Sequence, residues 1–194
     1  AYVGHVGDDI NGRFCIDRMR QFGVQTDHVA VIPKGKTPVA YVFVTKSSGA
    51  RSIVYEKNDL PKIDFNRHLE ELASVSKVVM LDPEVTYLGR ALKTDADRGL
   101  KVVYDCERWR EGMQGMMSVA DYYIPSADYF DSPELNLAPG SLVQKMHHLN
   151  QRISGVLIAT NGEDGAYCCQ NQSILHVAVP EVDAIDTIGA GDNF

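Results

Sequence analysis

The spacing of apolar and polar positions divides most of the chain into short strands that alternate with helices. Strands are predicted at 77–81, 101–104, 122–124 and 155–159, and helices at 84–98, 113–117 and 141–151. This order is typical of βαβ units built around a mostly parallel sheet. After residue 160 the pattern changes and predicts an antiparallel pair of strands, 165–169 and 173–177, joined by a polar turn.

The first part of the chain predicts one helix and one hairpin. Asp8 or Asp9 can cap a helix that places Cys15, Met19 and Phe22 on one face and ends at Gly23. Two apolar strands follow at 39–44 and 51–55, separated by the turn 47–50. Both faces of the first strand are apolar, which predicts a thin hairpin that needs a cover.

Composition narrows the class of protein. With 194 residues, of which 44% are hydrophobic, the chain can form one domain with a substantial core. A net charge of −7 argues against a general nucleic-acid surface, and no apolar run is long enough to predict a membrane span. The four cysteines lack metal or redox spacing, which favours free thiols in a reducing cytoplasm.

The segment from Asp186 to Asp192 contains the clearest candidate chemistry. Gly189, Ala190 and Gly191 form a glycine-rich turn that can expose consecutive backbone N–H groups to an anion. Asp192 follows directly, and a carboxylate there is a poor phosphate ligand because of charge repulsion. It is well placed to accept a proton from a hydroxyl that attacks phosphorus. The simpler alternative is a glycine-rich turn capped by an aspartate.

The string D-T-I-G-A-G-D-N-F at 186–194 resembles the second signature of the ribokinase/PfkB family of carbohydrate kinases. The resemblance implies a ribokinase-like three-layer α/β fold with a mostly parallel central sheet and a small β lid. Residues 1–36 and 59–194 would form the α/β domain, and residues 37–58 the lid. Family members begin with a further strand and continue past the signature, so we expect this chain to be an internal part of a longer kinase.

A second segment resembles the T-x-G-x-x-G nucleotide loop of the family. It runs from Thr160 to Gly165 and follows a predicted buried strand. In that role, Gly162 would let the backbone approach the phosphates, and the Thr160 hydroxyl could donate a hydrogen bond to them. A plain β-turn between two strands is the alternative.

The family resemblance also reveals a departure at Ser126 and Tyr129. Relatives often carry P-N-x-x-E at this point, where the Asn and Glu organise Mg²⁺ and phosphates, whereas this chain has P-S-A-D-Y. The replacement argues against direct metal ligation, and leaves Asp128 or Asp131 to act through water. Ser126 remains a candidate for the nucleotide site.

The remaining candidate residues concern the sugar and a monovalent cation. Asp82 ends a predicted strand, where relatives can carry an acidic sugar contact, although it can equally cap the helix beginning at Pro83. Tyr41, in the lid segment, is a further candidate for sugar contact. Asp186 and the Ile188 carbonyl match positions that hold a monovalent cation, K⁺, in several relatives.

These features predict an ATP-dependent kinase that phosphorylates a hydroxyl of a sugar or sugar-like molecule. Asp192 would act as the general base and the turn Gly189–Gly191 as the anion hole, with ATP and Mg²⁺ as cofactors and a homodimer formed through the lid. A nucleoside kinase of the same fold is one alternative. A nucleotide- or sugar-binding module without catalysis is the other.

Overall fold

The computed structural model describes residues 1–45, 51–56, 60–94, 99–180, 189 and 191. Backbone contacts divide the chain into two compact units, residues 1–64 with 184–194, and residues 65–183. The predicted division, in which 37–58 is a lid on the remaining residues, stays a prediction. None of the helices in the described part of the chain has the length and apolar character needed to span a membrane.

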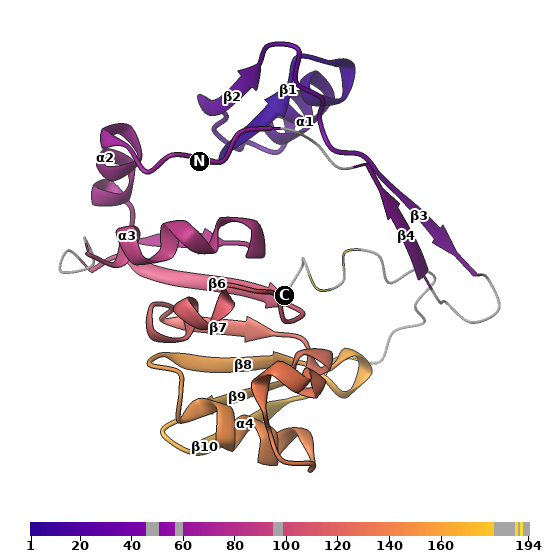
Figure 1. Ribbon diagram of the computed structural model, residues 1–194, viewed down its shortest axis with the longest axis vertical. Coiled ribbons are helices and arrows are strands. Elements are labelled where there is room, and N and C mark those ends of the chain that lie inside the picture. Colours follow the sequence, from indigo (N-terminus) through magenta and orange to yellow (C-terminus); the bar gives the residue numbers. More distant parts are fainter. Residues whose placement is uncertain (46–50, 57–59, 95–98, 181–188, 190, 192–194) are drawn as a thin grey trace. The chain divides into compact units, whose positions relative to one another are not determined.

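The second unit is built on a six-stranded sheet with the order β10-β9-β8-β7-β6-β5 (Figure 1). Its strands are β5 (Val78–Leu81), β6 (Lys101–Glu107), β7 (Tyr122–Pro125), β8 (Val156–Thr160), β9 (Ala166–Gln170) and β10 (Ser173–Val177). Strands β5 to β8 are mutually parallel, while β9 and β10 add antiparallel pairs at one edge. The prediction of a mostly parallel sheet with an antiparallel extension is therefore confirmed.

Helical segments precede and connect these strands. They are α2 (Arg67–Val75), η1 (Pro83–Leu88), α3 (Gly89–Thr94), η3 (Met113–Ser118), η4 (Ala127–Asp131), η5 (Pro133–Leu135), α4 (Leu142–Asn150) and η6 (Gly162–Asp164). Because β5 to β8 follow one another in one direction, right-handed crossovers put their connections on one face of the sheet. That face carries fully buried side chains such as Val102, Tyr123 and Leu157. The opposite face leaves Met80 and Leu175 exposed.

The predicted helices differ from the structure in detail. The helix expected at 84–98 begins as the 3₁₀ segment η1 and continues as the short helix α3, because Val85 has non-helical torsions of −115° and 21°. Residues 95–98 lie outside the described residues. The helix α4 begins as expected, since Ser141 and Gln144 form a capping box. Helix α2, capped by the Asn66 side chain, was not predicted.

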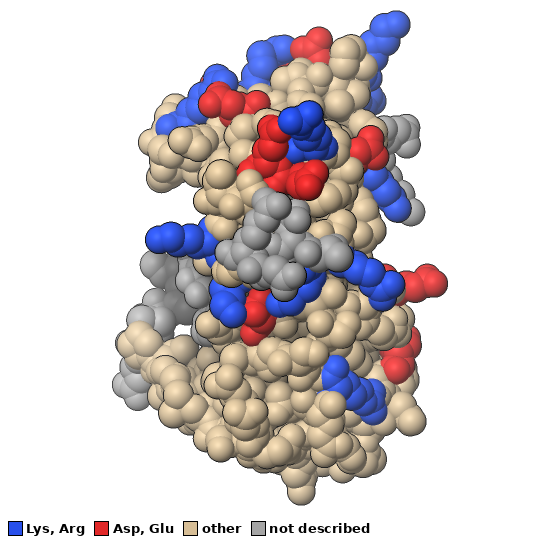
Figure 2. All heavy atoms as spheres, turned by 90° about the vertical axis from the view of Figure 1, so that its left-hand side faces the viewer, with Lys and Arg blue, Asp and Glu red and all other residues tan. Residues whose placement is uncertain are grey.

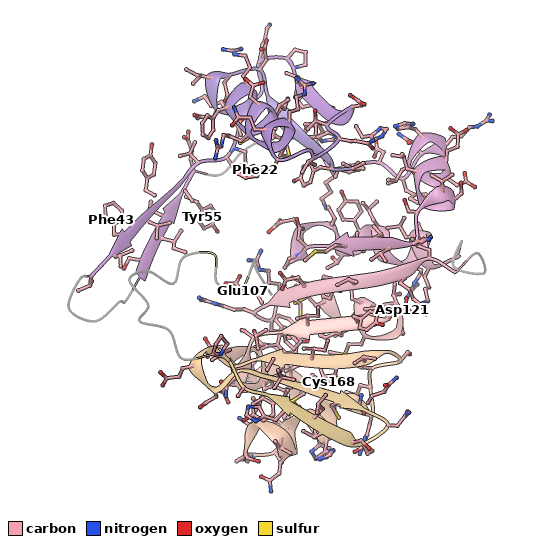
Figure 3. All side chains as sticks on the ribbon, turned by 180° about the vertical axis from the view of Figure 1, so that it is seen from behind. Phe22, Phe43, Tyr55, Glu107, Asp121 and Cys168 are labelled. Carbon is pink, nitrogen blue, oxygen red and sulfur yellow. The ribbon has the colours of Figure 1, made fainter. Side chains whose placement is uncertain are left out.

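Asp121 ties together three strands at the amino end of the sheet. Its carboxylate accepts hydrogen bonds from Lys93 Nζ (3.0 Å), Lys101 Nζ (3.1 Å) and Val102 N (2.9 Å). Its backbone bonds to both Val102 and Val156. Figure 3 places Asp121 at the opposite end of the strands from Glu107. On the side of the molecule drawn in Figure 2, acidic and basic side chains are intermixed in the middle, and the surface below them is largely uncharged.

Replacement of Asp121 by asparagine should lower the free energy of unfolding at neutral pH by about 2 kcal/mol. Burial alone would raise the pKa of Asp121, but the Val102 N–H and the two lysines hold that pKa below its ordinary value. The native state therefore gains stability from the ionised form, and this gain is lost as the pH falls below about 4 towards the folded-state pKa. Urea unfolding should show the difference between the two proteins shrinking over that range. A constant difference would contradict the assignment.

A cluster of tyrosines fills the core between β6, β7 and η4. Tyr123 and Tyr129 are fully buried, and their hydroxyl groups share a hydrogen bond of 2.7 Å. The Tyr104 ring lies 5.3 Å from the Tyr123 ring, and its hydroxyl has no hydrogen-bond partner in the described structure. Burial raises the pKa of Tyr104, so this hydroxyl stays protonated at all ordinary pH values.

Replacement of Tyr104 by phenylalanine should leave the protein equally stable or up to about 1 kcal/mol more stable, because the lost hydroxyl is buried without a partner. The matched control is Tyr123→Phe, which strands the Tyr129 hydroxyl and should cost about 1–2 kcal/mol. Thermal unfolding of the two variants provides the measurement. Equal losses of stability in the two variants would show that the Tyr104 hydroxyl does have a hydrogen-bond partner.

The first unit contains a parallel pair of strands and one helix. Strand β1 (Val3–Gly7) pairs with β2 (His28–Ile32), and α1 (Ile10–Gln21) connects them. Asp9 caps α1 and Gly23 follows it with φ of 77°, as predicted. Phe22 is not part of a buried face, since it is 76% exposed beneath the Arg18 guanidinium. Strand β2 was not predicted.

Asp9 also holds the start of the predicted lid segment. Its carboxylate accepts hydrogen bonds from Gly12 N (2.7 Å), Thr37 N (2.7 Å) and the Thr37 hydroxyl (2.8 Å). Thr37 Oγ1 in turn accepts from Gly7 N at 2.9 Å. The backbone N–H groups of Thr37 and Gly12 hold the pKa of Asp9 below its ordinary value. The helix-capping role of Asp9 thus extends to fixing residue 37 against the end of β1.

The predicted hairpin is present as strands β3 (Ala40–Val44) and β4 (Arg51–Tyr55). Tyr41 pairs with Val54, and Ala40 pairs with Tyr55, so apolar side chains occupy both faces. Phe43 and Tyr55 point to opposite sides of the hairpin (Figure 3), and they are 63% and 65% exposed. The predicted turn at 47–50 lies outside the described residues.

Candidate active site

The carboxyl ends of the parallel strands bring two predicted site residues together. Ser126 follows β7 and Thr160 ends β8, and the two residues form an isolated parallel bridge. Ligands of open α/β sheets bind at this edge. Glu107, the last residue of β6, marks the same edge in Figure 3. Two of the residues predicted for the nucleotide site are therefore neighbours in the structure, while their role in binding nucleotide stays a prediction.

Glu107 was missed by the sequence analysis. It has φ of 40°, in the left-handed region, and it lies at an irregularity in the pairing of β6 with β7. Its carbonyl accepts hydrogen bonds from Ser126 N (3.1 Å) and Ser126 Oγ (2.6 Å). Its carboxylate pairs with Arg110 at 3.7 Å, and Arg110 also pairs with Glu84 at 2.6 Å. No sequence pattern predicts a glutamate whose backbone lies in the left-handed region.

The segment from Thr160 to Gly165 folds into a tight turn between β8 and β9. Asn161 N donates to Gly165 O (2.8 Å), and Asp164 N donates to Asn161 O (3.0 Å). Gly162 has φ of 53°, and a Cβ built on it would meet nothing within 4 Å. A Cβ on Gly165 would lie 2.1 Å from Val177 O. Gly162 thus leaves open space above the turn, whereas Gly165 permits the chain after β10 to approach closely.

The loop after β7 does not fit a direct Mg²⁺ site. The Ser126 hydroxyl donates to the Glu107 carbonyl, and the Tyr129 hydroxyl is buried against Tyr123. Asp131 pairs with Lys145, and both Asp128 and Asp131 are exposed. No group of three potential metal-ligating side chains gathers anywhere in the part of the chain that the structure describes. The expectation drawn from the missing Asn and Glu stays a prediction.

The two candidate sugar contacts are both exposed. Asp82 stands at the carboxyl end of β5, and its side chain accepts a hydrogen bond from Glu84 N (2.8 Å) as the cap of η1. The capping alternative is therefore realised, and a role in binding sugar remains a prediction. Tyr41 lies on the hairpin of the first unit with its side chain 59% exposed.

The signature near the end of the chain is described at two positions. Gly189 has φ of 75°, a conformation that glycine adopts readily, and a Cβ on Gly191 would meet nothing within 4 Å. Four further predicted site residues lie outside the described residues, namely Asp186, Ile188, Ala190 and Asp192. Their predicted roles as metal ligands, anion hole and general base are therefore untested by the structure.

Comparison with known sequences identifies relatives of the whole chain. The model of the "pfkB family carbohydrate kinase" matches residues 1–194. Deoxyribokinase of Salmonella typhi is 26% identical over 200 residues, covering 97% of this chain and 64% of the relative. Ketohexokinase of Mus musculus is 27% identical over 207 residues, with coverages of 98% and 65%. The chain thus spans less than two thirds of the length of these relatives.

Solved structures share the fold. Ribokinase from Giardia lamblia superimposes with a TM-score of 0.78 at 22% identity, covering 98% of this chain and 62% of that one. Ribokinase from Arabidopsis thaliana, complexed with ribose and ATP, gives a TM-score of 0.78 at 20% identity, with coverages of 98% and 64%. These likenesses confirm the ribokinase-like α/β fold. The match of the family model along residues 1–194 shows that the chain belongs to the pfkB family of carbohydrate kinases.

Proposed function

We propose that the protein transfers the γ-phosphoryl group of ATP to a hydroxyl of a sugar or sugar-like molecule. The observation that carries the proposal is the glycine-rich signature from Asp186 to Asp192 in a chain of this family. The turn from Thr160 to Gly165 has open space beside Gly162 and lies next to Ser126 at the carboxyl edge of the sheet, which supports a nucleotide site. Named relatives act on deoxyribose and ketohexose sugars, which supports a small sugar as the acceptor.

In this proposal Asp192 accepts the proton of the sugar hydroxyl as the hydroxyl oxygen attacks the γ-phosphorus. A new P–O bond to the sugar forms, the bond from the γ-phosphorus to the bridging oxygen breaks, and ADP leaves. The backbone N–H groups of Gly189, Ala190 and Gly191 stabilise the charge on the transferring group. Positioning and electrostatic stabilisation supply most of the rate in such reactions.

The nucleotide phosphates would lie over the turn that follows β8. The Thr160 hydroxyl would donate to them, Gly162 would allow the backbone to approach, and Ser126 would lie alongside. Mg²⁺ would neutralise phosphate charge while bound mainly to ATP oxygens and water, which requires few protein ligands. Asp186 and the Ile188 carbonyl would contribute to a K⁺ site. Asp82 and Tyr41 are proposed to contact the sugar.

A coupled assay of ADP release tests the function directly. The purified protein should release ADP when given ATP, Mg²⁺ and one member of a panel containing 2-deoxyribose, ribose and fructose. ADP release with adenosine alone would favour a nucleoside kinase. ATP binding in calorimetry without ADP release for any acceptor would show a binding module without catalysis.

We also propose that the protein forms a homodimer through the hairpin β3–β4 in the cytoplasm. The hairpin exposes apolar side chains on both faces, which a two-stranded sheet cannot bury by itself. The four free cysteines favour a reducing compartment.

Replacement of Phe43 and Ile53, which lie on opposite faces of the hairpin, by serine should convert the proposed dimer to a monomer in sedimentation measurements. The matched control is Phe22→Ser, because Phe22 is an exposed aromatic outside the hairpin, and that variant should stay dimeric. An unchanged protein that is monomeric at all concentrations would overturn the dimer.

A further inference from the structure

His176 connects the edge strand β10 to the turn proposed to bind nucleotide. Its Nε2 lies 2.6 Å from the Asp164 carbonyl oxygen, which can only accept, so Nε2 carries the proton and donates. Its ring stacks on the ring of Tyr167, with centroids 4.4 Å apart and planes 20° apart. His176 and Tyr167 are direct cross-strand partners in the β9–β10 pair. The imidazole is therefore fixed in both position and direction.

The turn itself is held largely by hydrogen bonds among its own residues. These bonds are local: Asn161 N donates to Gly165 O, Asp164 N to Asn161 O and Gly165 N to Gly162 O, and the Asn161 side chain donates to Asp164 Oδ2 at 3.1 Å. Gly162 has open space on the side where a Cβ would stand. Because these bonds are local, a contact from outside the turn adds to the order of its backbone, and less conformational entropy is then lost when a ligand binds.

We propose that His176 is a positioning residue that holds the turn 160–165 in the shape that presents the Gly162 backbone to nucleotide phosphates. The inference rests on the proposed nucleotide-binding function of this turn. By fixing the Asp164 carbonyl from outside the turn, His176 reduces the freedom that nucleotide binding has to remove. Its loss should therefore weaken ATP binding by about tenfold and leave the Michaelis constant for the sugar nearly unchanged.

Two substitutions separate the hydrogen bond from the aromatic stack. His176→Phe keeps a ring against Tyr167 but cannot donate, whereas His176→Gln can donate to the Asp164 carbonyl but cannot stack. The matched control is His148→Phe, because His148 is an exposed histidine on α4, away from this turn. Calorimetry with ATP, steady-state kinetics for both substrates and thermal unfolding are measured for all four proteins.

The expected result is ATP binding weakened about tenfold in His176→Phe, largely restored in His176→Gln, and unchanged in His148→Phe. Unchanged ATP binding in His176→Phe, or equal weakening in the Phe and Gln variants, would overturn the positioning role. The unchanged protein provides the check on the underlying function. If the unchanged protein failed to bind ATP, the proposed function would be wrong and this inference with it. If the unchanged protein and His176→Phe bound ATP equally well, only the role of His176 would be overturned.

Discussion

Asp192→Asn is expected to lower kcat by about 100-fold or more while leaving the affinities for ATP and sugar nearly unchanged. The amide is almost isosteric with the carboxylate but cannot accept the proton of the attacking hydroxyl. The glycine-rich turn of residues 189–191 keeps its backbone N–H groups in the variant, so phosphate binding should persist. Steady-state kinetics for both substrates, combined with calorimetric binding of ATP, measures the two effects separately.

The control for this variant is Asp17→Asn, the same chemical change at an exposed position of α1. It should keep the turnover of the unchanged protein. An Asp192→Asn variant whose kcat stayed within a few fold of the unchanged protein would remove Asp192 from the role of base. A large loss of ATP affinity would instead indicate that the carboxylate organises the nucleotide site.

Gly165→Ala is expected to lower the free energy of unfolding by about 3 kcal/mol. The backbone at Gly165 has torsions of 88° and −141°, a combination almost confined to glycine. The added Cβ would also lie 2.1 Å from Val177 O, so the chain after β10 would have to move. Urea unfolding of the variant measures the loss.

The neighbouring glycine offers a matched contrast. Gly162→Ala adds a methyl group where nothing lies within 4 Å, so it should cost only about 1 kcal/mol of stability. Because the same open space is proposed to receive phosphate, this variant should bind ATP about tenfold more weakly. If Gly165→Ala were as stable as Gly162→Ala, the close approach to Val177 would be wrong. Normal ATP binding by Gly162→Ala would remove the turn from the nucleotide site.

Much of the fold could be predicted because hydrophobic period and capping chemistry are local properties. The parallel strands, the hairpin and the start of α4 at Ser141 all follow from residues within one or two turns of each other. The break at Val85 could not be predicted, because neither a proline nor a glycine stands at that position. Strand β2 and helix α2 did leave signals, a short apolar run and an Asn66 cap, which were overlooked.

The candidate site was less accessible to sequence reasoning, because its geometry depends on contacts between distant residues. Ser126 and Thr160 were identified through motifs, and the bridge between them follows from strand order. The left-handed Glu107 and its two hydrogen bonds to Ser126 join residues 19 positions apart. Likewise, the sequence showed that Tyr129 replaces an acid, but only the fold shows its hydroxyl joined to Tyr123.

The ion pairs and hydrogen bonds of Asp121 stabilise one end of the sheet, whereas the candidate site lies at the other end. Lys93, Lys101 and Val102 N donate hydrogen bonds to this carboxylate, whereas the opposite ends of the same strands lead into the connections after β6, β7 and β8. Scaffolds of this kind tolerate change in loops that rest on a rigid base. Mutagenesis libraries that diversify the exposed residues Arg108, Asp128 and Glu163 at this edge should therefore yield folded proteins with altered nucleotide affinity, provided that Asp121 and its two lysines are retained.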